Sequence, residues 1–243
     1  MKIILSPSKT QNSDIRIESL NNPKYFKLTK MIIKELKSYS DDDISKIMKI
    51  KGKLLDETIE LINNFKNKPN YLTPAILNYT GVVYESLNYE EYSELEREYL
   101  NNNLRIVSAL YGVLRPMDGV QNYRLDFTMK LKNINLNHFW KEVILKEFKN
   151  ESIILDCASQ EFSQFLKPLK DKVHRVEFID VVDGKEKIIS YNAKKMRGLM
   201  AHYCIKHQIK TIEEIQLFDE DGYTFDILSS NKQVSIFKRS SNH

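Results

Sequence analysis

The sequence predicts a mixed α/β fold that forms one domain over residues 1–243. Short apolar runs typical of strands alternate with longer amphipathic segments typical of helices, without the regular strand–helix–strand rhythm of a fully parallel fold. The chain contains only 7 Gly and 6 Pro, and no segment rich in either marks a linker between domains. Its 42% hydrophobic and 29% charged residues are ordinary for a globular protein, so a chain of this length can bury a sizeable core.

The N-terminal half is expected to begin with a strand and to continue mainly as helices. Lys2–Leu5 is a short apolar run that ends at Ser6-Pro7-Ser8. Asn22-Pro23 is expected to open a helix, because Asn is a favoured N-cap and Pro fits the first helical position. Apolar residues at helical spacing extend this helix to Leu36. The other elements expected here are helices over 41–48, 54–65 and 89–100 and a strand over 104–107.

The C-terminal half is expected to alternate between strands and helices. A helix over 137–148 carries the only Trp, Trp140. Asp183-Gly184 lies between two alternating apolar runs and is the strongest hairpin signal in the chain. The other elements expected here are a strand over 152–155, helices over 160–166 and 192–207, and a second hairpin that joins 225–228 to 234–238.

Residues 110–127, LYGVLRPMDGVQNYRLDF, combine two Gly, one Pro and two Arg with many apolar residues. Gly112 and Asp118-Gly119 supply turn geometry, whereas the apolar residues between them favour burial. We therefore predict a loop that is packed against the core, so that Arg115 and Arg124 extend from a rigid backbone.

The net charge of +4 is small, but charges of opposite sign are separated along the chain. Residues 1–53 hold 12 Lys or Arg against 6 Asp or Glu, and residues 164–210 hold 11 against 5. Between them, residues 85–98 hold 6 Glu and a single Arg. A basic face of this kind attracts polyanions, although Lys-rich helices also occur simply as solvated surfaces.

Nothing in the sequence indicates a membrane or a secreted setting. No window approaches the ~18 apolar residues of a membrane span, and the apolar run at the N-terminus is only 3 residues long. Cys157 and Cys204 lie far apart without metal-ligand spacing, which fits buried thiols in a reducing compartment. We therefore expect a cytoplasmic protein with no cofactor, no metal and no membrane partner.

Four polar or basic clusters lie at the ends of predicted elements, at residues 6–10, 112–124, 156–161 and 193–198. Ligands of open α/β sheets gather beyond the carboxyl ends of the strands. Arg is suited to phosphate or carboxylate because its guanidinium forms two parallel hydrogen bonds. The alternative is that the clusters only cap and bridge elements. The cations expected to converge are Lys9, Arg115, Arg124, Lys194 and Arg197.

Residues 41–65 suggest a second way of holding a phosphate backbone. Two predicted helices flank a short basic segment, a layout similar to the helix–hairpin–helix unit, whose hairpin amides and lysines grip DNA without reading bases. Lys51, Gly52 and Lys53 would make these contacts. Such a unit often has two hairpin glycines and this segment has one, so a plain αα-hairpin with solvated lysines is the alternative.

An enzymatic function lacks a recognisable motif. HExxH, P-loop, GxGxxG and GxSxG patterns are absent, and His202 and His207 are not spaced as two metal ligands on one helix face. Ser159 and Glu161 follow a predicted strand, so both are candidate catalytic residues, with Glu161 as general acid or base. Alternatively, Ser159 caps the next helix and Glu161 lies in its first turn.

Five separated motifs together resemble the YaaA family of peroxide stress resistance proteins. They are SPSKT at residues 6–10, ALYGVLRP at 109–116, YRLDF at 123–127, ASxEF at 158–162 and AKKMRGLM at 193–200. Gly222-Tyr223 and Phe237-Lys238-Arg239 match the C-terminal pattern of the family, so the resemblance covers essentially the whole chain.

The resemblance implies a single compact α/β domain of unusual topology, with a central mixed sheet and peripheral helices. It implies a cytosolic protein that helps cells survive hydrogen peroxide by limiting free iron and damage to DNA and protein. It also implies binding of duplex and branched DNA through a basic cleft and a helix–hairpin–helix element, which falls at residues 41–65 here. No dense cluster of metal ligands is visible in the sequence, so an effect on iron is expected to be indirect. Cleft roles fall to Lys9, Arg115, Arg124, Lys194 and Arg197, and hairpin roles to Lys51, Gly52 and Lys53.

Three functions are compatible with these features. The first, which we favour, is a monomeric, sequence-nonspecific DNA-binding protein of the oxidative stress response, whose affinity falls steeply with salt. The second is an enzyme acting on a nucleobase, nucleotide or DNA lesion in the same cleft, with Glu161 as acid or base and Tyr111 or Tyr123 stacked on a flipped base. The third is a non-catalytic protein whose basic face meets an acidic partner, or the acidic helix at 89–100 of a second copy.

Overall fold

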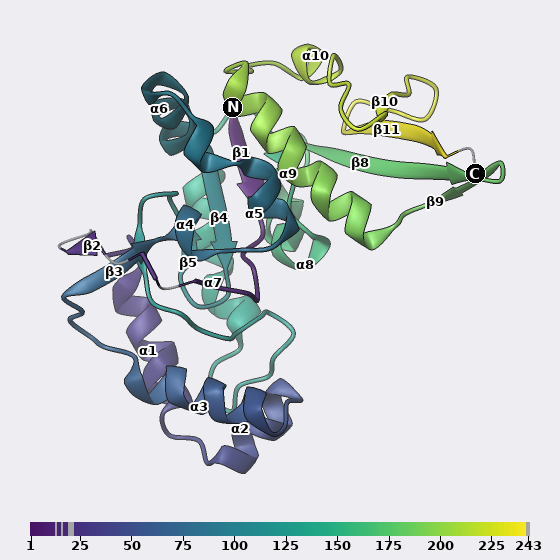
Figure 1. Cartoon of the computed structure of the whole chain (residues 1–243). Coiled ribbons are helices and arrows are strands. Elements are labelled where there is room, and N and C mark those ends of the chain that lie inside the picture. Colours follow the sequence, from purple (N-terminus) through teal and green to yellow (C-terminus); the bar gives the residue numbers. More distant parts are fainter. Residues whose placement is uncertain (13, 16, 19–21, 242–243) are drawn as a thin grey trace.

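An eight-stranded mixed sheet forms the centre of the molecule (Figure 1). This computed structural model describes residues 1–12, 14–15, 17–18 and 22–241. Five neighbouring strands run parallel and three short ones are antiparallel to their neighbours, which confirms the predicted fold class. In spatial order the strands are β10 (Thr224–Phe225), β11 (Val234–Ser241), β8 (Val173–Val182), β7 (Ile154–Asp156), β1 (Lys2–Leu5), β4 (Leu104–Ser108) and β5 (Gly112–Leu114), with β9 (Lys185–Lys187) paired to β8.

Helices cover both faces of this sheet (Figure 1). One face carries α9 (Ser190–Lys206), which packs against α5 (Val82–Leu87) and α6 (Glu94–Asn103). The other face carries α7 (Leu136–Phe148), which packs against β5 and the 3-10 helix η2 (Gln164–Leu169). The shorter helices are α4 (Ala75–Asn78), η1 (Tyr89–Glu91), α8 (Gln160–Ser163) and α10 (Ile212–Ile215).

A separate layer lies beyond the carboxyl ends of the parallel strands (Figure 1). It contains α1 (Phe26–Leu36), α2 (Asp41–Met48) and α3 (Lys53–Asn64). A small antiparallel sheet of β2 (Ile17–Glu18), β3 (Tyr71–Pro74) and β6 (Gly119–Val120) lies beside these helices. Residues 115–118 connect β5 of the central sheet to β6 of this layer.

Local chemistry accounts for several element boundaries. Ser40 begins α2 with a capping box, in which the Ser40 hydroxyl accepts a hydrogen bond from the Asp43 amide and the Asp43 carboxylate accepts one from the Ser40 amide. The predicted hairpin at Asp183-Gly184 is confirmed, since φ is +52° and +71° at these residues, as a type I′ turn requires. The predicted second hairpin is present as the pairing of β10 with β11, but its first strand ends at Phe225, so the strand expected over 225–228 is wrong in its bounds.

Some predicted helix boundaries are wrong. α1 begins at Phe26 rather than after Asn22, because the Phe26 amide first donates a hydrogen bond to the Pro23 carbonyl in a separate turn. The acidic helix expected over 89–100 is divided into η1 and α6, because Ser93 opens a new capping box with Glu96. The helix expected over 160–166 consists of α8 followed by the tighter turns of η2.

Residues 110–127 are indeed packed against the core, but they include strands β5 and β6 rather than a loop alone. Gly112 adopts a φ of +75°, and a Cβ atom added there would lie 2.5 Å from Cζ3 of the fully buried Trp140. The indole Nε1 of Trp140 also donates a hydrogen bond to the Ala109 carbonyl at 2.8 Å. Only glycine meets both conditions at position 112, so the chain turns tightly over the indole.

Candidate nucleic-acid interface

The loops that follow β1, β4 and β7 begin at the same level of the central sheet. Strand register places Leu5 beside Ile106, and Ile4 beside Asp156. The residues after these strands therefore share the carboxyl edge of the sheet, as expected for a ligand site of an open α/β fold. Two of the four predicted clusters, at residues 6–10 and 156–161, contribute to this edge, together with the motif at residues 123–127, which overlaps only the end of the cluster predicted at 112–124.

Direct hydrogen bonds join these three segments. The Ser159 amide donates to Ser6 Oγ at 2.8 Å, and the Ser6 hydroxyl donates to Ser159 Oγ at 3.2 Å. Glu161 Oε1 accepts a hydrogen bond from the Phe127 amide at 2.9 Å. Ser159 occupies the N-cap position of α8, but its side chain makes no capping hydrogen bond. The expectation of side-chain capping by Ser159 is therefore wrong, because Ser6 engages this residue instead.

Two carboxyl groups at this edge have pKa values shifted in opposite directions. Burial alone would raise the pKa of Asp126, but hydrogen bonds from Thr128 and Lys9 outweigh burial and hold the pKa below its usual range. Lys9 Nζ lies 3.2 Å from Asp126 Oδ2. Burial raises the pKa of Glu161, the hydrogen bond from Phe127 opposes this, and the charge of Asp126 adds to the rise. The surroundings thus shift Asp126 toward its ionised form and Glu161 toward its protonated form, each relative to the free carboxyl group.

Two glutamine side chains hold the backbone of this region in place. Gln11 Oε1 accepts from the Tyr123 amide at 2.9 Å, and Gln11 Nε2 donates to the Tyr123 carbonyl at 3.0 Å. Gln121 binds the amide and carbonyl of Lys66 in the same way, each at 2.9 Å. Sequence reasoning missed both residues, because a glutamine that binds a distant peptide group carries no local signal.

Tyr111 and Tyr123 belong to the core, so their suggested role in stacking on a base is wrong. The Tyr111 ring is fully buried, and its hydroxyl donates to the Gln121 carbonyl and accepts from the Gln121 amide. The Tyr123 hydroxyl lies 2.7 Å from Ser108 Oγ and 3.0 Å from the hydroxyl of Tyr79. Burial raises the pKa of Tyr123 to about 12. The two rings support the segment that carries Arg124.

Arg124 lies between two hollows. A recess of about 70 Å³ next to Lys9 and Asp126 opens beside a groove of about 910 Å³ between α3 and residues 65–73 and 120–124. Lys9, Gln11, Tyr123 and Arg124 line both. The Arg124 Nε atom is buried and has no hydrogen-bond partner among the residues that the structure describes.

The α9 cluster lies near the same edge. Burial raises the pKa of Asp156 at the end of β7, while hydrogen bonds from Ser163 and Ala158 and the charges of Arg175 and Arg197 oppose the rise. The charge of Arg197 thus acts on the carboxyl group at the end of β7. Lys194 is exposed one turn earlier on α9, a spacing that places it on the same helix face.

Arg115 does not join this group. It follows β5, which is antiparallel to β4, so the register that pairs Leu114 with Ile106 directs the chain back toward Arg105. Burial lowers the pKa of Arg105, and the charge of Arg115 lowers it further. The expectation that Arg115 converges with the other cations is wrong, because an antiparallel strand ends at the opposite edge.

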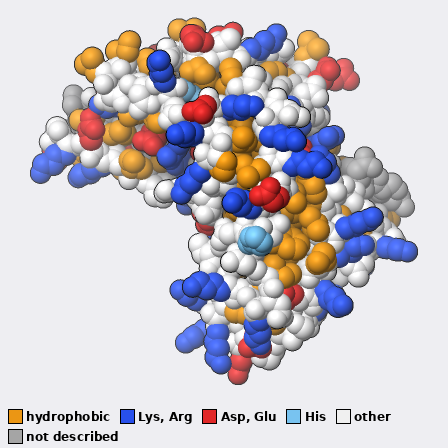
Figure 2. All heavy atoms as spheres, turned by 180° about the vertical axis from the view of Figure 1, so that it is seen from behind, with side chains coloured by type: hydrophobic (Ala, Val, Ile, Leu, Met, Phe, Trp, Pro, Cys, Tyr) orange, Lys and Arg blue, Asp and Glu red, His pale blue; other side chains and the backbone are white. Residues whose placement is uncertain are grey.

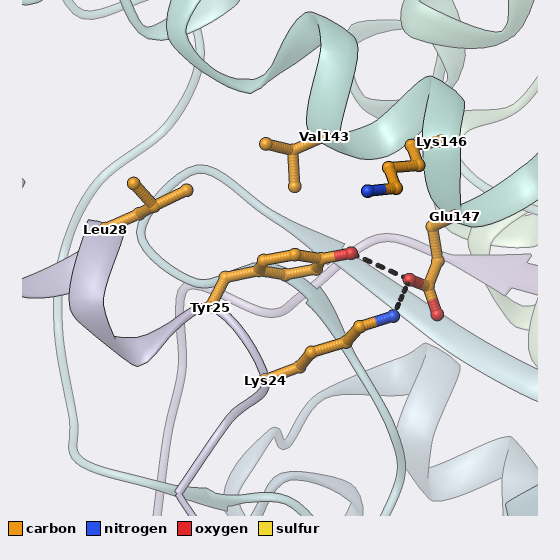
Figure 3. A pocket seen from close by; sticks show the side chains of 6 residues that line it. All are labelled: Lys24, Tyr25, Leu28, Val143, Lys146 and Glu147. Carbon is orange, nitrogen blue, oxygen red and sulfur yellow. Dashed lines mark hydrogen bonds and ion pairs between the residues drawn. The ribbon is translucent and has the colours of Figure 1, made fainter.

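A hollow of about 450 Å³ lies elsewhere, between the start of α1 and the end of α7 (Figure 3). Its polar groups bind one another, since the Tyr25 hydroxyl and Lys24 Nζ both donate to Glu147 Oε2, at 2.8 and 2.6 Å. Leu28 and Val143 form its apolar wall (Figure 3). None of the predicted site residues lies here.

The predicted hairpin residues are exposed at the start of α3. Lys49 adopts a left-handed conformation with a φ of +54°, and Gly52 occupies the N-cap position with a φ of +56°. Lys51, Gly52 and Lys53 all face solvent. Lys132 Nζ binds Asp43 Oδ2 at 2.7 Å, so the loop that follows Asp126 is fastened to α2.

Seen from behind, the molecule has a notch between its two lobes at the left of the view (Figure 2). The lobe above the notch corresponds to β8, β9 and α9, and the lobe below it to α2 and α3, when the view is compared with Figure 1. Lys and Arg side chains are visible on both sides.

The described residues contain no group of three or more His, Cys, Asp or Glu that could hold a metal ion. Burial raises the pKa of both the Cys157 and Cys204 thiols. None of the helices in the part of the chain that the structure describes combines the length and apolarity needed to cross a membrane.

Comparison with known proteins establishes the family. A family model described as peroxide stress protein YaaA matches residues 1–227. The chain belongs to the peroxide stress protein YaaA family. Relatives of similar length include a UPF0246 protein of Fusobacterium nucleatum, 37% identical over 98% of this chain and 99% of its own length. UPF0246 proteins of Marinomonas and Acaryochloris marina are each 34% identical over 98% of this chain and cover 97% and 100% of their own lengths. This membership supports a role in the oxidative stress response and confirms the resemblance inferred from the motifs.

Proposed function

We propose that this member of the family is a sequence-nonspecific DNA-binding protein that acts in the cytoplasm during peroxide stress. It binds duplex or branched DNA along the carboxyl edge of the central sheet, and so limits damage to DNA and, indirectly, free iron. The α2–α3 pair acts as a helix–hairpin–helix element that holds a second stretch of the phosphate backbone.

The observation that carries this proposal is that Arg124 and Lys9 line the same recess and remain able to bind a ligand. Gln11 holds the backbone of Tyr123, the residue before Arg124. The Arg124 Nε atom nevertheless has no partner among the described residues, and Arg124 lines two hollows. The Lys9 side chain is 67% exposed, although it pairs with Asp126. Cations that are fixed in position and still open to a ligand suit phosphate contacts, which supply most of nonspecific DNA affinity.

The α2–α3 pair supports the second contact. Helix N-termini attract phosphate because their first amides and the helix dipole are positive. α3 is 12 residues long and begins beside Lys51 and Lys53, with Gly52 leaving space for a close approach of the backbone. The link between Lys132 and Asp43 holds this end in a fixed relation to the Asp126 loop.

The test is DNA binding over a salt series, with blunt duplex and four-way-junction DNA. Wild-type protein is expected to show a steep slope of log affinity against log salt. The Arg124→Ala/Lys194→Ala double variant should lose about 1.8 units of that slope, because each phosphate contact contributes about 0.9. Failure of the wild-type protein to bind either DNA would contradict the proposed DNA binding. An unchanged slope in the variant would contradict binding at this edge.

A second candidate function is catalysis at the same edge. The observation that favours it is the opposite pKa shifts of Asp126 and Glu161, since pairs of this kind often divide acid and base roles. Glu161→Gln keeps the oxygen that accepts from the Phe127 amide. If this variant binds DNA normally but no longer protects cells from peroxide, catalysis is favoured. Full protection by the variant counts against catalysis.

A further inference from the structure

The groove beside α3 has cationic side chains on one wall and hydrogen-bond acceptors on the other. The groove between α3 and residues 65–73 and 120–124 has a volume of about 910 Å³, within the range of ligand sites. Lys66 and Arg124 belong to the wall formed by residues 65–73 and 120–124, and Lys9, from the segment after β1, also lines the groove. Glu57, Glu60 and Asn64 lie on the α3 side. A ligand that fits this division has anionic groups along one edge and hydrogen-bond donors along the other.

Tyr71 adds an aromatic surface to this groove. It is the first residue of β3, lines the groove, and is 55% exposed, in contrast to the buried Tyr111 and Tyr123. The Tyr71 ring is therefore not enclosed by the core, and an exposed aromatic face can stack on a planar ligand. Bases stack on such rings only when they are unpaired, because duplex bases already stack on each other.

The cationic side is rigid before any ligand binds. Gln121 holds the backbone of Lys66 through both its amide and its carbonyl, and Tyr111 holds the backbone of Gln121. Gln11 holds Tyr123, the neighbour of Arg124. Lys66 and Arg124 are thus presented from backbone that is already fixed, which lowers the entropic cost of binding a flexible strand.

The charges on the two walls would favour one orientation of a nucleic-acid strand in the groove. Glu57 and Glu60 repel phosphates from the α3 side, although Lys53 lies 3.7 Å from Glu57 and offsets part of that charge. The phosphates therefore lie along Lys66 and Arg124, and the bases point toward α3. Carboxylate and amide oxygens on α3 then accept hydrogen bonds from exocyclic amino groups of the bases.

We propose that this groove binds an unpaired stretch of DNA strand, with one base stacked on Tyr71 and the adjoining phosphates on Lys66 and Arg124. This inference rests on the proposed DNA binding and narrows it to DNA in which duplex and single strand meet. The groove thereby selects frayed, gapped or branched DNA over intact duplex. A free nucleotide offers the same base and phosphate groups as a DNA strand, so it is the competing ligand for this groove.

The experiment compares a blunt duplex with the same duplex carrying a single-stranded overhang, by fluorescence anisotropy. Wild-type protein is expected to bind the overhang DNA more tightly. Tyr71→Ala should weaken overhang binding about 5- to 150-fold, the equivalent of one stacked base, and leave blunt-duplex binding unchanged. Tyr71→Phe, which keeps the ring, should bind like wild type. Leu95→Ala, an exposed apolar residue on the acidic α6, serves as the control and should change neither affinity.

The outcomes separate this inference from the proposed function. Equal binding of overhang DNA by wild type and Tyr71→Ala, with blunt-duplex binding intact, overturns the inference alone. Loss of wild-type binding to both DNAs overturns the proposed function and the inference together. A deoxynucleoside monophosphate that displaces overhang DNA as effectively as a single-stranded oligonucleotide would assign the groove to free nucleotides instead.

A second variant guards against misfolding of Tyr71→Ala. Tyr71→Trp keeps a stacking surface and introduces an exposed indole, whereas the only native Trp is buried. Its emission should be quenched by overhang DNA and by single-stranded DNA but not by blunt duplex. Absence of quenching at saturating overhang DNA would contradict stacking at this position.

Discussion

Gln11 binds both backbone polar groups of Tyr123, with its Oε1 accepting from the amide at 2.9 Å and its Nε2 donating to the carbonyl at 3.0 Å. The two residues are separated by 112 positions in the chain. A side-chain amide here replaces a neighbouring strand, and so joins the segment after β1 to the segment that carries Arg124. Gln11 is thus a positioning residue for Arg124.

Gln11→Ala is expected to lower the free energy of unfolding by about 1–3 kcal/mol, because the buried Tyr123 amide and carbonyl lose their partners. It should also weaken DNA binding, since Arg124 is no longer held. Urea unfolding and a DNA titration measure the two effects. Gln233→Ala is the control, because Gln233 is exposed and its amide nitrogen makes only a 3.4 Å contact with the Lys170 carbonyl. Equal stability of the Gln11 variant and wild type would contradict the role assigned to Gln11.

Lys51→Ala/Lys53→Ala should lower the salt slope of DNA binding by about 1.8 units if both lysines contact phosphates. Both are exposed at the start of α3, so folding should be unaffected. Lys206→Ala/Lys210→Ala removes the same charge near the far end of α9, and its slope should match that of wild type. An unchanged slope in the Lys51/Lys53 variant would make α2–α3 a plain helical hairpin.

Asp126 has a folded-state pKa below its usual range, so its ionised form stabilises the fold. This contribution is present above the unfolded-state pKa of about 3.9 and is lost as pH falls through the folded-state pKa. Asp126→Asn should therefore be less stable than wild type near neutral pH, and the difference should shrink below about pH 4. Urea unfolding across this range measures it. A difference that grows on acidification would contradict the assignment.

Ionisation of Glu161 is expected to have the opposite effect on stability to ionisation of Asp126. Its pKa is raised in the folded state, so ionisation destabilises the fold as pH rises from the unfolded-state pKa of about 4.3 through the folded-state value. Glu161→Gln removes that cost and should gain stability relative to wild type over this interval. Below it the two proteins should be equally stable. The same unfolding series reports both carboxyl groups.

Gly112→Ala should destabilise the protein by about 2–4 kcal/mol, combining a positive φ with a methyl group placed against Trp140. Gly184→Ala is the matched control, since Gly184 also has a positive φ but a Cβ there would meet nothing within 4 Å. The difference between the two variants in urea unfolding isolates the contact with Trp140. Equal losses would mean that backbone conformation alone accounts for the effect.

Local chemistry made much of the fold predictable. Residues 2–5 form a strand as their apolar run indicates, and Asp183-Gly184 forms the expected turn, because a type I′ turn depends on two adjacent residues. α2 begins where the acidic cluster indicates. Prediction was wrong where a distant or competing partner acts, as when Ser6 binds Ser159 in place of a helix cap or Ser93 divides an acidic helix.

The sequence by itself determined the mixed α/β class, the family through its motifs, and the segments that carry the candidate cations. Only the tertiary structure decided which of these cations come together. Lys9 and Arg124 line one recess although they are far apart in the chain, whereas the antiparallel register of β5 on β4 returns Arg115 to the opposite edge. It also decided that Tyr111 and Tyr123 are core and that Tyr71 faces a groove. A residue's type limits what it can bind, but burial and long-range hydrogen bonds determine whether it is available to bind it.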